Sequence, residues 1–480
     1  MIAMLLPVMP EVMLLTMACA ILVLDLFLSE ARRHVSYWLT QATLAACAWV
    51  AVTTMNPGPV VAFHGLVVDD VMSDFLKLAS CAAVSLMLFY GRSYLLARGL
   101  FKGETFVLTL TALLGIMVMV SANHFITLYM GLELQALSLY AMVAMHRTSN
   151  AATEAAMKYF VLGALASGML LYGMSMIYGA TGSLQLDAVS QAIFSGRGNR
   201  TLLTFGLVFV VSGLAFKLGV VPYHMWVPDV YHGAATPVTL FIGTAPKLAA
   251  FAITLRLLAV GLAGLEVDWS GMLLILSILS MIAGNLVAIA QTNIKRMLAY
   301  STIANMGFLL LGFVAATPNG YSAAMFYAVA YVLTSLASFG VVILLSREGF
   351  EADRIDDFKG LNQRSPWWAF VMLLTMFSLA GVPPTVGFYA KFAVIEAAVN
   401  AQFIWLAVAA VLASLVGAFY YLRIVKLMYF DDAADRSPIE ARGDARAILS
   451  LNGLALLVLG ILPQPLMGLC VVALTQSKFL

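Results

Sequence analysis

Five charged side chains interrupt long apolar stretches of this 480-residue sequence: Glu133, Lys158, Lys217, Lys247 and Lys391. A charged group at the centre of a bilayer costs about 3 kcal/mol on insertion scales, so each of these residues needs a reason to be there. Burial favours the neutral form of a lysine, whereas a nearby carboxylate favours the charged form. A glutamate whose distance to a lysine changes would therefore make that lysine take up or release a proton. This set of residue types indicates a proton relay.

The depth of these residues separates them from charges at helix ends. Glu133 lies about nine residues into its apolar stretch, roughly 14 Å along a helix and near the midplane of a bilayer. Lys217 and Lys247 are similarly deep, and Lys391 follows a pair of prolines. His224 comes after Lys217, on the same face of a helix if that helix is unbroken, and histidine titrates near neutrality after only a small shift. His224 therefore joins the candidate relay.

Several charges also fit an ordinary structural role. Lys158 follows Glu154 at the i,i+4 spacing of an ion pair near a helix end. Lys77 has Asp74 at the i,i+3 spacing, and a structural pair is favoured there too. Arg256 lies near the end of its apolar stretch, where a long side chain reaches the membrane interface and acts as an anchor.

The composition excludes a soluble enzyme as the main interpretation. Hydrophobic residues make up 62% of the chain and charged residues 10%, against about 25% charged in soluble domains. The net charge of only +2 argues against nucleic acid as a partner. The four cysteines form no CxxC pair, so no zinc or iron–sulfur site is expected. Neither a Walker A sequence nor a GxGxxG after a strand is present, and histidine pairs spaced for haem are not evident, so no cofactor is expected in this chain.

The apolar stretches predict an all-α polytopic membrane protein. A helix needs about 20 apolar residues to cross the hydrocarbon core, and backbone groups in lipid must be paired within their own segment. The first stretch lacks a basic segment before it and is too long for a signal peptide, so it is interpreted as a membrane helix. Fourteen spans are predicted at 4–28, 35–55, 70–90, 104–120, 124–145, 153–179, 201–220 (continuing to about 231), 236–261, 269–290, 295–316, 321–346, 366–398, 403–429 and 447–475.

The distribution of basic residues predicts the orientation. The loops after odd-numbered spans hold fifteen Lys and Arg residues, whereas the loops after even-numbered spans hold only Arg197 and Arg200. Because basic loops stay in the cytoplasm, both termini are predicted on the outer, periplasmic side.

Two breaks indicate an internal repeat. Spans 4 to 8 start from the inside and spans 9 to 13 from the outside, so two five-helix blocks run in opposite senses. The fourth helix of each block carries a Gly/Pro interruption, at 219–222 (GVVP) and at 381–384 (GVPP). Inverted repeats with broken helices are a common way to build a transport pathway. A single transmembrane domain is predicted, with three N-terminal helices (1–103), repeat one (104–261), repeat two (269–429) and a C-terminal helix (430–480).

Several strings resemble the antiporter-like subunits of respiratory complex I. They are GLEL (131–134), FKL (216–218), VPYHMWVPDVY (221–231), GAATPV (233–238) and QTNIKRMLAYSTI (291–303). The resemblance extends over residues from about 70 to 430. Within the family, SLAGVPPTVGF (378–388) followed by Lys391 resembles the subunit N branch of NADH–quinone oxidoreductases, because the M branch has glutamate at that position. Ala235 departs from the proline that is frequent in the family and puts no titratable residue in doubt.

The resemblance implies a role for each matching residue. Glu133 would sense the neighbouring unit, Lys217 would be its partner, Lys247 the central relay and Lys391 the terminal donor. His224 would bridge the broken helix. Lys158 and Lys295 would have secondary roles. His232, which flanks the loop-like stretch after the break, is a further supporting position.

The implied function is proton translocation in the membrane arm of a bacterial NADH–quinone oxidoreductase, in the inner membrane, beside other membrane-arm subunits. NADH, FMN, iron–sulfur clusters and quinone would then be bound by those other subunits, and this chain would hold no redox cofactor or metal. The alternative from a different class is a subunit of a multisubunit Na⁺/H⁺ antiporter, because its relatives share the Glu/Lys pair.

Overall fold

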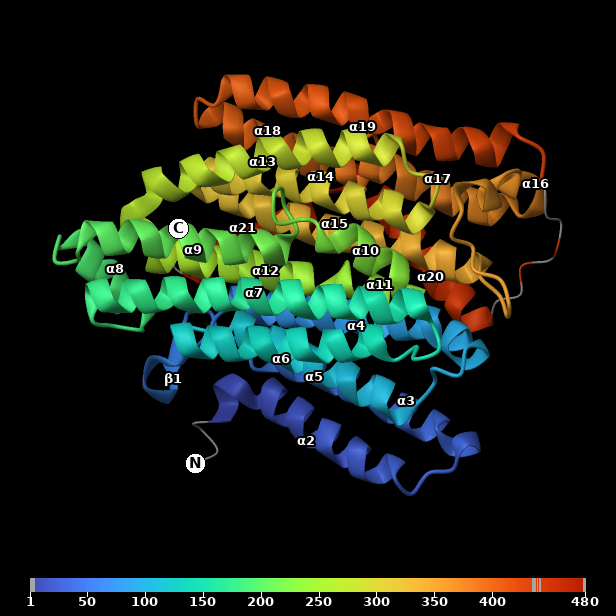
Figure 1. Ribbon diagram of the computed structural model, residues 1–480, viewed down its shortest axis with the longest axis horizontal. Coiled ribbons are helices and arrows are strands. Elements are labelled where there is room, and N and C mark those ends of the chain that lie inside the picture. Colours follow the sequence, from blue (N-terminus) through green and yellow to red (C-terminus); the bar gives the residue numbers. More distant parts are fainter. Residues whose placement is uncertain (1–4, 434–436, 438, 440–441, 478–480) are drawn as a thin grey trace.

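The structure is a computed structural model that describes residues 5–433, 437, 439 and 442–477. Long helices lie side by side along the longest axis of the molecule, with α2 at one edge and α19 at the other (Figure 1). Thirteen helices of the described chain are long and apolar enough to cross a membrane. The prediction of an all-α polytopic membrane protein is confirmed.

The elements follow the predicted spans closely. The helices are α2 (Met9–Asp25), α3 (His34–Thr53), α4 (Val71–Ala97), α5 (Gly103–Val120), α6 (Phe125–Ala144), α7 (Asn150–Thr181), α8 (Leu186–Phe194), α9 (Arg200–Leu218), α10 (Trp226–Gly233), α11 (Thr236–Ile242), α12 (Ala245–Thr254), α13 (Glu266–Ile289), α14 (Ile294–Val314), α15 (Pro318–Leu345), α16 (Leu361–Arg364), α17 (Pro366–Ala380), α18 (Val386–Asn400), α19 (Ile404–Phe430), α20 (Gly443–Ile461) and α21 (Gln464–Gln476). The short segments are the strands β1 (Val60–Ala62) and β2 (Val67–Asp69), the 3-10 turns η1 (Leu6–Val8), η2 (Glu30–Arg32), η3 (Phe63–Gly65), η5 (Ala263–Leu265) and η6 (Ile355–Phe358), and the π-helical segment η4 (Leu255–Gly261).

Both predicted breaks are present. Helix α9 ends at Leu218 and α10 begins at Trp226, while α17 ends at Ala380 and α18 begins at Val386. Each helix stops because a glycine, Gly219 or Gly381, adopts a left-handed conformation, and prolines that cannot donate a backbone hydrogen bond follow within a few residues. The predicted span 366–398 is thus divided into α17 and α18, which are both shorter than the helices counted above.

The predicted span 236–261 differs from a continuous helix. It is divided at Gly243 and Thr244 into α11 and α12, and it ends in η4. Pro246, at the second position of α12, lacks the donor that would continue the ladder from α11. This break places Lys247 in the first turn of a helix instead of the middle of one. Pro463 and Pro465 similarly lie where α20 gives way to α21.

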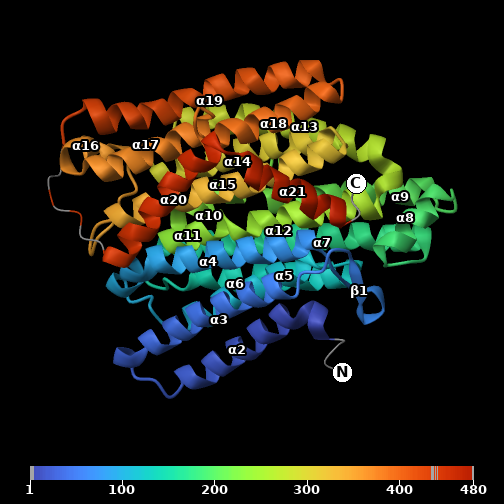
Figure 2. The same cartoon turned by 180° about the vertical axis from the view of Figure 1, so that it is seen from behind.

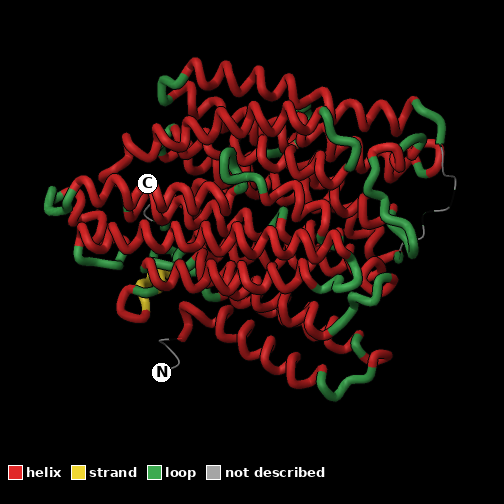
Figure 3. Tube along the Cα trace, viewed as in Figure 1, coloured by secondary structure: helices red, strands yellow, loops and turns green. Residues whose placement is uncertain are grey.

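The two ends of the described chain lie at the same end of the bundle (Figures 1 and 2). This end also carries the two-stranded hairpin of β1 and β2, shown in yellow in Figure 3. The opposite end carries α16 and the loops in which most of the basic residues lie. One of those basic residues, Arg436, lies outside the described residues.

Candidate functional site

Lys247 lies at the end of the first broken helix. Its Nζ donates to the carbonyl oxygen of Leu218 at 2.8 Å and to that of Lys217 at 3.4 Å. These carbonyls belong to the last turn of α9, where no later residue of the helix can pair with them. The Lys247 side chain is 1% exposed, and its Nζ lies 5.5 Å from the centre of the Trp226 ring.

Lys391 has the corresponding position at the second broken helix. Its Nζ donates to the carbonyl oxygen of Ala380, the last residue of α17, at 3.0 Å and to Ser414 Oγ, also at 3.0 Å. Ser414 Oγ donates in turn to the same carbonyl at 3.2 Å. The Lys391 residue is 6% exposed, and its Nζ lies 4.7 Å from the centre of the Phe308 ring. Each break therefore has one buried lysine on its terminal carbonyls.

The glycines that end the two helices leave the space these lysines occupy. A Cβ at Gly381 would lie 2.8 Å from Lys391 Cδ, and a Cβ at Gly219 would lie 3.6 Å from Lys247 Nζ and 2.8 Å from Val227. Both glycines also have a positive φ, +79° at Gly219 and +83° at Gly381, and this conformation disfavours any other residue. Neither lysine forms an ion pair with a carboxylate in the part of the chain that the structure describes.

Lys217 and Lys247 line one small, partly open cavity. This cavity of about 20 Å³ lies between α6, α7, α9, α10 and α12, with Gln135 and Tyr159 among its other lining residues. A space of this size holds about one water molecule. Lys217 is half-buried in the last turn of α9. The structure thus brings together two of the predicted relay residues.

Glu133, on α6, makes no direct ion pair with Lys217 in the described chain, although the two charges interact electrostatically. Its Oε1 is buried without a hydrogen-bond partner, and the phenols of Tyr129 and Tyr140 lie near it. Glu133 and Lys217 are therefore near enough to interact electrostatically, but no direct ion pair joins them in this structure.

His224 lies between α9 and α10, as predicted, and its Nδ1 is buried without a partner. Neighbouring residues hold the break in place: Val221 N–H donates to Ser280 Oγ at 2.9 Å, and the hydroxyls of Tyr223 and Ser212 are 2.7 Å apart.

Lys158 lies apart from the buried lysines. Its half-exposed Nζ is 2.7 Å from both Glu154 Oε1 and Asp229 Oδ2, and Asp229 also accepts a hydrogen bond of 2.8 Å from Arg296. The ordinary ion pair with Glu154 is present, and the additional partner Asp229 was not expected. These contacts join α7, α10 and α14.

Lys295 and His232 lie near the end with the basic loops. Lys295 is 3% exposed; its Nζ donates to the carbonyl oxygen of Ala234 at 2.8 Å and is 4.0 Å from Glu351. His232 Nε2 lies 4.0 Å from Asp353 Oδ2, beside an open polar cavity of about 500 Å³. Burial, together with the positive charges of Lys295 and Arg296, lowers the pKa of His232.

Sequence reasoning missed the polar groups around Lys391. Tyr327 donates to Asn305 Oδ1 at 2.7 Å, Asn305 donates to the Ser301 carbonyl at 2.8 Å, and the hydroxyls of Ser301 and Tyr421 are 2.5 Å apart. All four side chains are buried, and a cavity of about 10 Å³ separates Asn305 and Tyr327 from Lys391. A search for buried uncharged polar residues, rather than charges alone, would have found Asn305 near the middle of α14.

Two further charges differ from expectation. Arg256 is not an interface anchor: it is 3% exposed, donates to the carbonyl oxygen of Val120 at 2.7 Å and contacts both oxygens of Asp70 at 3.0 Å. Lys77 is fully buried, and the carboxylates of Glu11 and Asp69 lie near its ammonium group in addition to that of Asp74.

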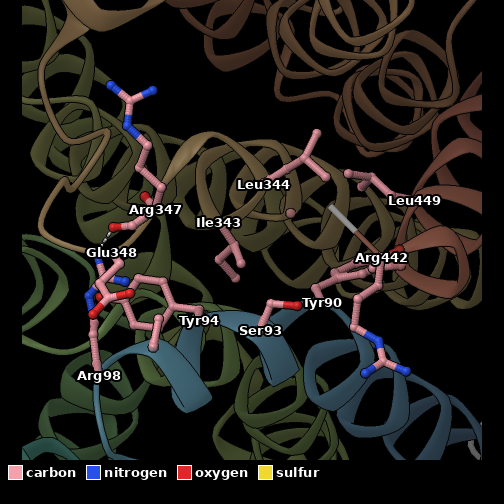
Figure 4. Close-up of a pocket in the computed structure, with 14 residues that line it drawn as sticks. Tyr90, Ser93, Tyr94, Arg98, Ile343, Leu344, Arg347, Glu348, Arg442 and Leu449 are labelled. Carbon is pink, nitrogen blue, oxygen red and sulfur yellow. Dashed lines mark hydrogen bonds between the residues drawn. The ribbon is translucent and has the colours of Figure 1, made fainter. Parts of the chain in front are cut away.

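A cavity of about 180 Å³ lies at the end with the basic loops, between α4, α15 and α20. Tyr90 and Ser93 line it, together with Leu344 and Leu449 (Figure 4). The guanidinium groups of Arg347 and Arg442 point in opposite directions, and that of Arg98 is paired with Glu351 at 2.6 Å, so the cavity offers no gathered positive charge. No cluster of metal-ligating side chains occurs among the described residues.

The sequence model of the family described as NADH:quinone oxidoreductase/Mrp antiporter matches residues 122–417. NADH-quinone oxidoreductase subunit N of Thiobacillus denitrificans is 61% identical over 471 residues, 98% of each chain, and that of Nitrosomonas europaea is 57% identical over the same share. A chain of respiratory complex I from Thermus thermophilus with bound Aureothin is 31% identical, with a TM-score of 0.83 over 97% of this chain and 100% of that one. A chain of the Mrp complex from Dietzia sp., at 22% identity and a TM-score of 0.84, shares the fold. The chain belongs to the subunit N family of NADH-quinone oxidoreductases.

Proposed function

We propose that this chain translocates protons as an antiporter-like subunit in the membrane arm of NADH–quinone oxidoreductase. The observation that carries the proposal is the placement of Lys247 and Lys391, each buried on the last carbonyls of a broken helix without a carboxylate partner. A lysine in such a place can hold a proton on hydrogen-bonded carbonyls and release it when those contacts change.

The proton path begins at Glu133 and Lys217. Movement of the Glu133 carboxylate towards Lys217 holds the lysine protonated, and separation releases the proton towards Lys247. The cavity lined by Lys217 and Lys247 has room for about one water to carry such a transfer. Lys391, with Ser414 beside it, is the terminal donor. His224, at the break, bridges the two halves of the helix, while Lys158, Lys295 and His232 have supporting roles.

The two breaks support an inverted repeat, with residues 104–261 and 269–429 as its units. The basic loops gather at the end opposite the described chain ends. By the positive-inside rule, that end faces the cytoplasm, and both termini lie on the periplasmic side of the bacterial inner membrane.

Electron transfer from NADH to quinone belongs to other subunits in this proposal. NADH, FMN, the iron–sulfur clusters and quinone bind there, and this chain binds no redox cofactor. Its partners are the neighbouring membrane-arm subunits. The rival function is that of a subunit in a multisubunit Na⁺/H⁺ antiporter, whose relative matches at a lower identity than the subunit N relatives do.

The test is proton pumping by the whole complex reconstituted in vesicles. Lys217→Ala should abolish or strongly reduce NADH-driven pumping and leave NADH oxidation by soluble acceptors unchanged. Lys217→Arg should not restore pumping, because guanidinium does not release protons in proteins. Pumping at the normal rate by the arginine variant would show that Lys217 is a fixed charge and would remove the first step of the relay. Sodium-dependent, NADH-independent exchange would favour the rival function.

A further inference from the structure

A second group of buried charges lies away from the broken helices, at the end of the bundle that carries the β-hairpin. Lys77, on α4, is fully buried, and its Nζ lies 2.9 Å from Glu11 Oε1, 3.8 Å from Asp69 Oδ1 and 3.9 Å from Asp74 Oδ1. Glu11, Asp69 and Asp74 are 7%, 3% and 1% exposed. The three carboxylates come from α2, β2 and α4, so the group joins three separate elements.

The charges of this group do not balance. The nearby Asp70 is occupied by the guanidinium of Arg256, at 3.0 Å to each of its oxygens. Lys77 is then the one cation facing Glu11, Asp69 and Asp74 in this part of the described chain. The other titratable groups packed nearby, the thiols of Cys47 and Cys81, are neutral in their ordinary state. If every carboxylate were ionised, two uncompensated negative charges would be buried, at a cost of several kcal/mol each.

A bound metal ion does not resolve this imbalance. The Lys77 ammonium already lies where a cation would be held by the three carboxylates, and no metal-ligating cluster occurs in the described chain. A proton reduces it instead, from two uncompensated negative charges to one. Asp69 and Asp74 lie 3.8 Å and 3.9 Å from the same Lys77 Nζ, so their carboxyl groups are neighbours, and a proton on one of them lets it donate to the other. The Oδ2 atom of Asp74 is buried and accepts no hydrogen bond from the described chain.

We propose that Glu11, Asp69, Asp74 and Lys77 form a proton-binding site, in which Asp74 carries the bound proton and donates it to Asp69. Lys77 remains charged and is paired with Glu11. Burial, against the opposing effect of Lys77, raises the pKa of Asp69, which agrees with a proton shared between the two aspartates. The site is separate from the relay lysines and stands independently of their role.

The test is infrared spectroscopy of the whole complex, in which a protonated carboxyl group gives its own C=O stretching band. Asp74→Asn replaces a neutral acid by a neutral amide of nearly the same shape, so the complex should assemble normally and lose one such band. The matched control is Asp187→Asn, because Asp187 is an exposed carboxylate on α8, and this variant should keep the band.

Each outcome bears on the proposal. Normal assembly of Asp74→Asn with the band lost supports it. Normal assembly with the band retained overturns it, because the proton would then lie elsewhere. Failure of Asp74→Asn to assemble also overturns it, because that result indicates an ionised Asp74 whose charge the complex needs.

Discussion

The Nζ atom of Lys247 donates a 2.8 Å hydrogen bond to the carbonyl oxygen of Leu218, so this buried lysine completes the end of a helix. In the proposed relay the same side chain has two tasks, to carry a proton and to satisfy a buried acceptor. Substitutions there act on stability as well as on transport, and the two effects can be separated.

Lys247→Met should abolish pumping and also destabilise the chain. Methionine keeps the length of the side chain but leaves the Leu218 carbonyl without its donor, and an unsatisfied buried group costs about 1–3 kcal/mol. NADH-driven pumping and the thermal midpoint of the complex measure the two effects. The control Leu248→Met changes the adjacent buried residue and should leave pumping intact. Full pumping by Lys247→Met would exclude Lys247 as a carrier.

Ser414→Ala should slow pumping without affecting NADH oxidation by soluble acceptors. Ser414 contacts both the Lys391 ammonium and the Ala380 carbonyl, so its loss removes one acceptor from the charged lysine. Ser414→Thr retains the hydroxyl and should retain most of the rate. Equal rates for the alanine variant and the unmodified complex would show that the hydroxyl plays no part in holding Lys391.

Gly381→Ala should lower both stability and pumping. The left-handed conformation costs a residue with a side chain about 1–2 kcal/mol of folding stability. The new methyl group would also displace Lys391. Gly168→Ala is the matched control, because that glycine lies inside α7 with open space around it. The comparison uses the amount of assembled complex and its thermal midpoint. If both variants behave alike, the glycine at the break is not required.

The proposed orientation predicts that cysteines introduced at Arg354 and Gly58 react with impermeant reagents from opposite faces of the membrane. Gly58 lies near the hairpin, and Arg354 is exposed among the basic loops. The background carries Cys19→Ser, because Cys19 is the exposed cysteine among the four native ones. Reaction of both positions from one face would contradict the topology.

The spans and both breaks were predictable because lipid permits few backbone structures and because Gly–Pro strings end helices locally. The division at Thr244 was missed, although Pro246 was a local signal, because the apolar pattern continues on both sides of it and suggests one continuous span. Lys77 pairs with Glu11 and Arg256 pairs with Asp70. Both pairs join elements that are far apart in the sequence, so no local pattern predicts them. Ser414 and Asn305 are uncharged, so a search for deep charges does not select them.

The opposite directions of α9 and α17 have a consequence for the membrane potential. Helix α9 starts at the hairpin end and α17 at the end with the basic loops, and both stop inside the bundle (Figures 1 and 2). Each helix carries a partial negative charge at its C-terminus, close to its lysine. Because the two dipoles are antiparallel, their energies in a transmembrane field have opposite sign and largely cancel. In the proposed relay, the voltage dependence of transport then comes from the protons that move between the lysines.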